Sequence, residues 1–406
     1  MEIDVRPFDG EPRDFLEAAE LAFSDRVRDE DVAPWESTFE PDRAIAAYDG
    51  ERIVGTAGIL SFELAVPGGV LPAAGVTIVG VQPTHRRRGI LRRMMRQQLD
   101  AIHDRGEPLA ILWASEGSIY QRFGYGLASL RTRVSIERER SAFRLPHTPA
   151  GAIRIVQADE ARRLFAPVYD GVLAARPGFF NRTPAWWDHE FFRDPEHWRR
   201  GLSQAWYIVH EVAGEARGYA KYRIKSEWSD AGSQSVVVVS EVMALDPAAH
   251  LDLWRYLLDI DLMAKVEAWN VAGDDPILLS VAEPRRLNIG LSDALWLRVV
   301  DVASALAGRR YRTDGRLVLE VADEFCGWNH GRWALTVEDG LPLGEPSSDS
   351  PDLACDATDL AAVYLGAFTF AQLADAGRVR ELLPGGLERA DALFRTDRQP
   401  WCPAVF

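Results

Sequence analysis

A short basic segment stands out because its charge runs against that of the chain. Six arginines follow His85 up to and including Arg96, and no acidic residue lies between His85 and Asp100. Gly89 lies within this run, where the hydrophobic spacing changes from that of a strand to that of a helix. The unpaired N–H groups of a helix N-terminus, together with guanidinium groups, are suited to binding a pyrophosphate. The segment therefore predicts an anion-binding loop.

The order of elements around this loop separates it from other basic segments. The sequence contains no GxxxxGK[ST] and no GxGxxG after a strand, which excludes two common phosphate loops. A solvated basic face or a nucleic-acid patch is the competing interpretation. The specific context of a strand, a turn and a helix favours a cofactor loop.

The surrounding sequence predicts an α/β unit that would position the loop. Ala74–Val81 reads as a strand and Ile90–Ile102 as a helix with one apolar face. Leu109–Ala114 reads as a further strand, and Ile119 opens a short helix. Together with the hairpin pattern of the preceding residues, this order indicates a mixed sheet covered by helices.

A second unit repeats this order after a proline-containing linker, Leu145–Pro149. Ser235–Leu245 is expected to form a strand, Ala248–Glu267 a helix, and Ile277–Val281 a strand. The repeat predicts a tandem duplication. No glycine or arginine cluster follows Asp246-Pro247, so we expect the second copy to be structural and unable to hold a pyrophosphate in the same way.

The rest of the chain predicts an α+β region from about Trp296 onward, with Val299–Leu306 as a helix and no evident catalytic triad. The eight histidines show no HxH or HExxH spacing, so no metal site is expected. The three cysteines lack paired spacing, which argues against a disulfide framework.

Composition limits the partners of the chain. Its 406 residues include 46 Lys and Arg against 61 Asp and Glu, a formal net charge of −15. This acidic excess disfavours a nucleic-acid partner and is compatible with a cationic one. Met1 is followed by Glu2 and Asp4 rather than by a basic leader, and no apolar run is long enough to cross a bilayer. We therefore expect a cytoplasmic protein.

Two motifs carry a resemblance to a known family. Arg86–Leu91 resembles the pyrophosphate loop of GNAT acetyltransferases, with Leu91 in place of the usual final small residue. Together with the Ala114–Gly126 motif, the segment Val81–Gly89 is similar to the Eis (enhanced intracellular survival) family. The resemblance implies tandem GNAT folds followed by a sterol-carrier-like domain, and an acetyl-CoA-dependent N-acetyltransferase. It also implies a homo-oligomer, with a hexamer as the expected state.

This resemblance implies three domains and a set of site residues. The domains would be a catalytic GNAT domain at 1–148, a degenerate GNAT-like domain at 149–294 and a sterol-carrier-like domain at 295–406. The residues expected to contact acetyl-CoA are Val79, Gly80, Val81, Arg87, Arg88, Gly89, Ile90, Leu91, Arg92, Ser115 and Glu116.

The resemblance also implies an acid and a base. Tyr120 would protonate the departing CoA thiolate, because a phenol with a pKa of about 10 is neutral at pH 7. Tyr125, five residues on, is the rival and resembles a packing residue. The carboxylate of Phe406 would be the base, and the apolar sequence before it suits an inserted segment. The alternative is a segment that merely docks or forms an oligomer contact.

The resemblance also implies an acceptor that is a small cationic amine such as an aminoglycoside. By similarity, Asp25 and Trp35 would line its pocket. Val405 and Trp113 stand where family members can carry polar side chains, which puts aminoglycoside use in question without affecting acetyl transfer. Two alternatives remain: a protein-lysine acetyltransferase, or a lipid- or partner-binding module that uses the C-terminal region.

Overall fold

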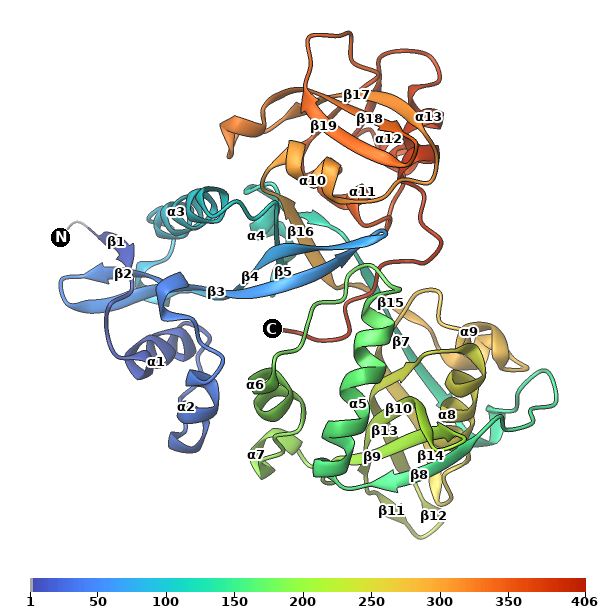
Figure 1. The fold of residues 1–406 in the computed structure, drawn as a ribbon. Helices are drawn as coiled ribbons and strands as arrows, with labels where there is room; N and C mark the ends of the chain where they lie inside the picture. Colours follow the sequence, from blue (N-terminus) through green and yellow to red (C-terminus); the bar gives the residue numbers. More distant parts are fainter. Residues whose placement is uncertain (1–2) are drawn as a thin grey trace. The chain divides into compact units, whose positions relative to one another are not determined.

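The computed structural model describes residues 3–406. The alternating pattern of residues 2–9 predicts a first strand, and its first residue, Glu2, lies outside the described residues. The chain forms two compact units (Figure 1). Unit 1 contains residues 1–129, 294–397 and 404–406, and unit 2 contains residues 130–293 and 398–403. The three domain ranges inferred from the sequence remain a prediction. Their boundaries do not coincide with those of the sheets, because residues 130–137 pair in the sheet of unit 2 and residues 295–299 pair in the sheet of unit 1.

Unit 1 contains a seven-stranded sheet in the order β1-β2-β3-β4-β5-β16-β6. Its strands are β1 (Asp4–Pro7), β2 (Ile45–Asp49), β3 (Arg52–Val66), β4 (Gly69–Val81), β5 (Leu109–Trp113), β16 (Leu295–Val299) and β6 (Gly126–Leu127). Its helices are α1 (Pro12–Ala22), α2 (Asp29–Glu36), α3 (Ile90–Asp104) and α4 (Gly117–Gln121). The helix α2 was not expected from the sequence.

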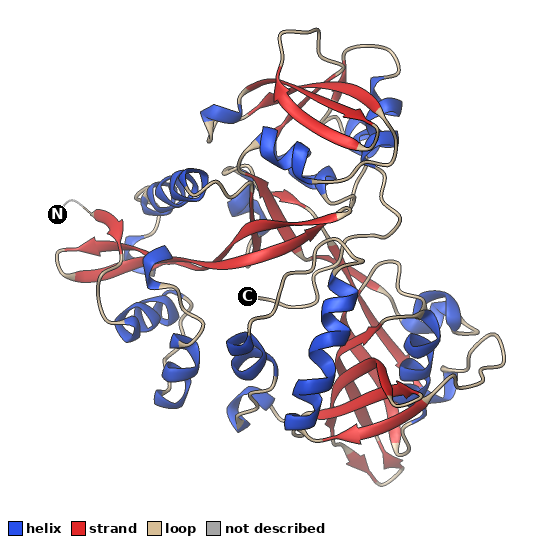
Figure 2. Ribbon diagram, in the orientation of Figure 1, coloured by secondary structure: helices blue, strands red, loops and turns tan. Residues whose placement is uncertain are grey.

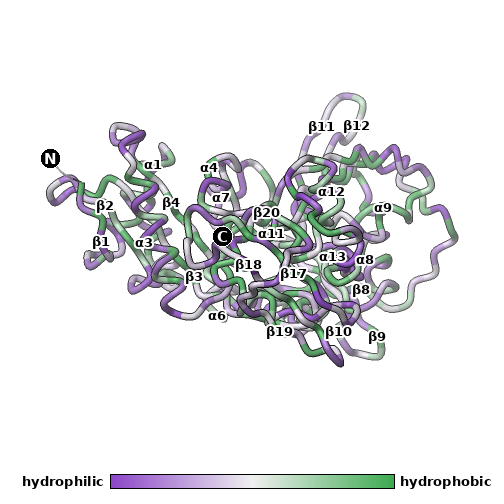
Figure 3. Tube along the Cα trace, turned by 90° about the horizontal axis from the view of Figure 1, so that it is seen from above, coloured by the Kyte–Doolittle hydropathy of each residue, from purple (hydrophilic) through white to green (hydrophobic). Residues whose placement is uncertain are grey.

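The helices α1 and α3 cover opposite faces of this sheet. Ala46 packs in one cluster with Phe15 of α1, whereas its neighbour Ala47 packs with Met94 of α3. Successive residues of a strand point to opposite faces, which fixes this arrangement. In Figure 3, α3 alternates between hydrophilic and hydrophobic residues, as expected for a helix with one buried face.

The C-terminal part of unit 1 is a five-stranded sheet in the order β19-β18-β17-β20-β21, accompanied by helices (Figure 2). Its elements are α10 (Val302–Gly308), β17 (Gly315–Ala322), β18 (Gly331–Glu338), β19 (Leu341–Pro346), β20 (Leu353–Asp356), α11 (Ala357–Tyr364), α12 (Phe370–Asp375), β21 (Arg380–Glu381) and α13 (Gly386–Phe394). The expected helix Val299–Leu306 is wrong at its start, because Val299 ends the strand β16.

Unit 2 contains a second seven-stranded sheet, in the order β15-β7-β14-β13-β10-β9-β8. Its main elements are β7 (Leu130–Glu137), β8 (Ala152–Val156), α5 (Ala158–Leu173), β9 (Trp206–Val212), β10 (Glu215–Lys225), β13 (Ser235–Ala244), α8 (Pro247–Asp259), β14 (Met263–Val271), α9 (Ile277–Ser280) and β15 (Gly290–Asp293). The helices α5 and α8 lie on opposite faces, because Tyr219 stacks on Phe165 of α5 while Ala220 packs with Leu253 of α8.

Two expectations for unit 2 are wrong. The helix expected at Ala248–Glu267 ends at Asp259, and the strand β14 begins at Met263. The strand expected at Ile277–Val281 is the short helix α9. The parallel partner of β13 is therefore β14, and the duplicated order of strand, helix and strand is completed earlier than expected.

Candidate active site

The strands β4 and β5 of unit 1 pair only over a short stretch. Their parallel pairing joins Ala73–Gly75 to Leu109–Ile111 and stops there. Beyond it, Thr77–Val81 is only half-buried, and a bulge against β3 places Ile78 at a φ of 44°. This edge of β4 can therefore form backbone hydrogen bonds with an extended ligand, including at the predicted cofactor residues Val79, Gly80 and Val81.

The loop after β4 is held by its own side chains. Buried Gln82 donates to the carbonyl oxygen of Ile53 at 2.7 Å. The Arg86 guanidinium donates to the carbonyl oxygens of Val81 at 3.1 Å and Ala22 at 3.0 Å. These bonds fasten the loop to the strand and to α1, so Arg86 is engaged within the fold.

The N-terminus of α3 is open at Gly89. This glycine has a φ of 78° and precedes the helix without a side chain that could cap it. Arg87 also adopts a left-handed φ, of 64°. Two left-handed residues turn the loop sharply, so that the first N–H groups of α3, beginning at Ile90 and Leu91, remain available to an anion.

Some arginines of the loop contact other parts of the fold, whereas others are exposed to solvent and free of ion pairs among the described residues. Arg93 donates to the carbonyl oxygen of Ile3 at 2.6 Å, and the Arg92 guanidinium lies 5.3 Å from the Phe325 ring centroid. Arg87 and Arg88 are exposed and form no ion pair with any residue from 3 to 406. These two predicted residues are therefore the uncommitted charges beside the helix N-terminus.

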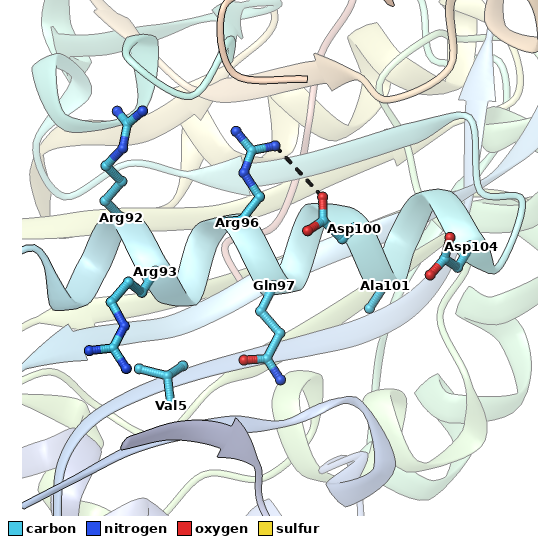
Figure 4. A pocket seen from close by; sticks show the side chains of 8 residues that line it. All are labelled: Val5, Arg92, Arg93, Arg96, Gln97, Asp100, Ala101 and Asp104. Carbon is cyan, nitrogen blue, oxygen red and sulfur yellow. Dashed lines mark ion pairs between the residues drawn. The ribbon is translucent and has the colours of Figure 1, made fainter. Parts of the chain in front are cut away.

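A shallow groove of about 570 Å³ runs along the outer side of α3 (Figure 4). Arg92 and Arg93 line it at one end, and Asp100 and Asp104 lie toward the other. Arg96 pairs with Asp100 at 3.6 Å, so the positive charge of the groove is concentrated near the N-terminus of the helix.

Tyr120 lies in α4 and is 7% exposed. Burial raises the pKa of its phenol to about 12, because the charged phenolate would lose its hydration. The Tyr125 ring lies 6.0 Å away in an edge-on arrangement, but this rival is completely buried and its hydroxyl has no hydrogen-bond partner. Burial raises the pKa of both phenols, so both keep their protons at neutral pH, but only Tyr120 reaches the surface.

The other predicted residues lie in different places. Ser115 and Glu116 are exposed between β5 and α4. Asp25 is exposed and lines a groove of about 510 Å³ beside α1. Trp35 does not line that groove and stacks on Phe39, with ring centroids 4.3 Å apart. The two residues predicted to line the acceptor pocket therefore lie in different surroundings, Asp25 at this groove and Trp35 in an aromatic stack.

Phe406 contacts the sheet of unit 1. Its ring packs edge-on against Phe62, with centroids 5.0 Å apart. Phe62 in turn covers Gly75, where a Cβ atom would lie only 2.3 Å from the Phe62 ring. Since Gly75 is the last residue of β4 that pairs with β5, the Phe406 ring is linked through Phe62 to the point where the two strands part.

A buried ion pair, which no local sequence pattern indicates, supports the turn that follows Tyr120. Arg298 of β16 pairs with Asp323, and both side chains are at most 1% exposed. Arg298 also lies 3.5 Å from the carbonyl oxygen of Gly124. A Cβ at Gly124 would lie 2.0 Å from this guanidinium. The turn therefore packs directly against the Arg298 side chain.

We predict that Asp323→Ala destabilises the protein by about 3–5 kcal/mol, because it leaves the Arg298 charge buried without its partner. Asp349→Ala is the matched control, since it breaks the exposed pair with Arg316 and is expected to cost less than about 1 kcal/mol. Urea denaturation followed by tryptophan fluorescence measures both. Equal effects of the two variants would contradict the structural role of Arg298 and Asp323.

Comparison with known proteins decides the family. Two acetyltransferase (GNAT) domain models match residues 7–128 and 178–299, and a sterol carrier protein domain model matches residues 302–403. The chain is 34% identical to N-acetyltransferase Eis of Mycobacterium bovis, over 95% of this chain and 94% of that protein. It belongs to the Eis family of GNAT N-acetyltransferases.

Other relatives agree with this assignment. A Streptomyces avermitilis protein named "Uncharacterized N-acetyltransferase" is 43% identical over 92% of this chain and 91% of that one. The crystal structure of Eis1 from Mycobacterium abscessus matches with a TM-score of 0.85 and 33% identity, covering all of both chains. The predicted fold, two GNAT folds followed by a sterol-carrier-like domain, is confirmed.

As a GNAT acetyltransferase, the Eis-family enzyme uses acetyl-CoA and an amine acceptor. The parted strands, the open N-terminus of α3 and the uncommitted Arg87 and Arg88 fit such a substrate. Among the described residues, no group of three or more His, Cys, Asp or Glu side chains could hold a metal ion. None of the helices in that range is long and apolar enough to span a membrane.

Proposed function

We propose that this Eis-family enzyme binds acetyl-CoA at the parted edge of β4 and transfers the acetyl group to a primary amine of a small cationic acceptor, such as an aminoglycoside. The supporting observation is the early end of the β4–β5 pairing, which leads to a loop with two uncommitted arginines. The extended arm of acetyl-CoA would pair with Val79 and Val81, and its pyrophosphate would lie at Gly89 beside Arg87 and Arg88.

The proposed reaction is direct transfer. The neutral amine nitrogen attacks the thioester carbonyl carbon, a C–N bond forms and the C–S bond breaks. Tyr120 gives its phenolic proton to the departing thiolate sulfur, and the carboxylate of Phe406 accepts the proton lost by the amine. The buried phenol suits this role, because it keeps its proton until negative charge develops on sulfur.

A panel of acceptors tests the proposed substrate class. Aminoglycosides, polyamines and lysine-containing peptides are each incubated with acetyl-CoA, and free thiol and acceptor mass are measured together. We expect mass gains on the small polycations. Acetylation restricted to peptides would favour a protein-lysine acetyltransferase, and saturable lipid binding without acetyl transfer would favour a lipid-binding module. The proposed homohexamer is tested separately, by light scattering of the purified protein.

Extension of the chain tests the base. We predict that three added serines after Phe406 abolish turnover, because they move the carboxylate away from its position. Acetyl-CoA affinity is expected to stay within about twofold of the unmodified chain, since the loop at Gly89 is unaffected. Full turnover in the extended chain would reject Phe406 as the base.

A further inference from the structure

In both units, two parallel strands pair over a short stretch and then separate, but unit 2 lacks the phosphate loop of unit 1. The parallel pairing of β13 and β14 ends at Val239–Ala268, and β13 continues to Ala244 paired with β10 on its other edge. A bulge against β10 lies between Val239 and Glu241, just beyond the end of this pairing, as the bulge at Ile78 lies beyond the end of the β4–β5 pairing. The second GNAT fold therefore has the strand geometry of a cofactor cleft.

The N-terminus of α8 is closed to an anion. Asp246 caps this helix and accepts a hydrogen bond from the backbone N–H of Ala249 at 2.9 Å. The Arg217 guanidinium and the Ala249 N–H lower the pKa of this carboxyl, although burial opposes them, so it remains charged. A carboxylate occupies the place where Gly89 leaves the helix of unit 1 open, and it would repel a pyrophosphate.

The chain itself lies at this cleft. Residues 398–403, the terminal segment, belong to unit 2, and the Trp401 and Cys402 side chains are at most 7% exposed. Arg398 and Trp401 line a cavity of about 140 Å³ together with Val242–Pro247 at the end of β13 and Ala272 after β14. The segment thus borders the space that an extended cofactor arm would need.

Asn270 of β14 holds the terminal segment with both ends of its amide. Its NH₂ group donates to the carbonyl oxygens of Cys402 at 3.0 Å and Pro403 at 3.1 Å. Its oxygen accepts a hydrogen bond from the Trp401 indole N–H at 2.8 Å. Because Asn270 is itself 5% exposed, these bonds satisfy polar groups that water cannot reach.

On its other side, the terminal segment packs closely against residues 177–179. The Trp401 N–H donates to the carbonyl oxygen of Pro177 at 3.0 Å. Gly178 has a φ of 95°, and a Cβ there would lie 2.9 Å from the Trp401 carbonyl oxygen. The Phe179 ring packs edge-on against Trp401, with centroids 5.5 Å apart. The segment is therefore packed closely against Pro177, Gly178 and Phe179 on this side.

We propose that the cofactor cleft of the second GNAT fold is a receptor for the chain's own terminal segment, with Asn270 as the residue that positions it. Three residues follow Pro403, so an anchored segment limits the movement of Phe406 to about 10 Å. The consequence for catalysis rests on the proposed role of Phe406, whereas the anchor itself does not.

Thiol labelling of Cys402 tests the anchor in the full-length protein. Asn270→Leu keeps the branched shape of the side chain but removes both the amide donor and the amide acceptor. Trp401→Phe keeps an aromatic ring but removes the indole N–H and part of the ring system. We expect labelling of Cys402 by a maleimide, located by peptide mass mapping, to rise at least tenfold in the first variant and about threefold in the second. Gln234→Ala, which changes an exposed amide of the same unit, is the control and should leave labelling unchanged.

Turnover measured on the same variants separates the two proposals. Faster labelling with a lower kcat and an unchanged KM for acetyl-CoA supports both the anchor and the role of Phe406. Faster labelling with unchanged kcat supports the anchor and rejects Phe406 as the base. Unchanged labelling in folded variants overturns the anchor. If Asn270→Leu fails to fold, the Trp401→Phe result decides.

Discussion

Tyr120→Phe is expected to lower kcat by about 10²- to 10⁴-fold, the usual contribution of a general acid. The substitution removes one oxygen atom and keeps the ring that packs against Tyr125, so the fold should be unaffected. Acetyl-CoA affinity should change less than twofold, because the phenol is proposed to act only as the C–S bond breaks. Stopped-flow or steady-state release of CoA thiol measures the rate, and calorimetry measures the affinity.

The pH dependence provides a second check on Tyr120. Burial raises the pKa of this phenol to about 12, so its acid form persists across the range in which the enzyme can be assayed. The wild-type rate should therefore show no alkaline decline from this group between pH 7 and 10. Tyr125→Phe is the matched control, and it is expected to retain most of the activity. Unchanged turnover in Tyr120→Phe would reject the assignment.

The double variant Arg87→Gln/Arg88→Gln is expected to raise the KM for acetyl-CoA by about 10- to 100-fold, with kcat changed less than threefold. Each charge-assisted hydrogen bond contributes about 1.5–3 kcal/mol when sheltered, and exposure of these side chains lowers that value. Added salt should weaken wild-type binding more than that of the variant, because screening acts on the charges that the variant lacks.

A charge-matched control distinguishes the loop from the net charge of the protein. Arg140→Gln/Arg144→Gln also removes two exposed positive charges, but from residues outside the loop. We expect this control to change the KM for acetyl-CoA less than twofold. An equal rise in both double variants would mean that Arg87 and Arg88 act only through the overall charge.

Local patterns predicted the strand, turn and helix around Gly89 well because these parts are consecutive. The strand before Gln82, the glycine at the helix start and the apolar face of α3 all lie within one short segment. The end of α8 was missed because no glycine or proline lies between Asp259 and Met263 to mark it. Leu262 makes that turn with a φ of 63°, a conformation usually taken by glycine. The apolar run Ile277–Val281 was too short for its periodicity to separate a strand from a helix.

The supporting residues of the site lay beyond sequence reasoning for a different reason. Arg298 and Gly124 are 174 residues apart, and Asn270 and Cys402 are 132 apart. No local spacing links such pairs, because only the completed sheets bring them together. The acceptor prediction for Asp25 and Trp35 rested on a loose, local match and stays a prediction; Asp25 lines the groove beside α1, whereas Trp35 does not.

The stoichiometry of acetyl-CoA binding tests the central claim most directly. Titration of the intact protein by calorimetry should give one site per chain, weakened about 10- to 100-fold in the Arg87→Gln/Arg88→Gln variant. Of the two units, unit 1 alone combines separated strands with an open helix N-terminus. Two sites per chain would contradict the closed cleft of unit 2. Absence of saturable binding would contradict the assignment of the site at Gly89.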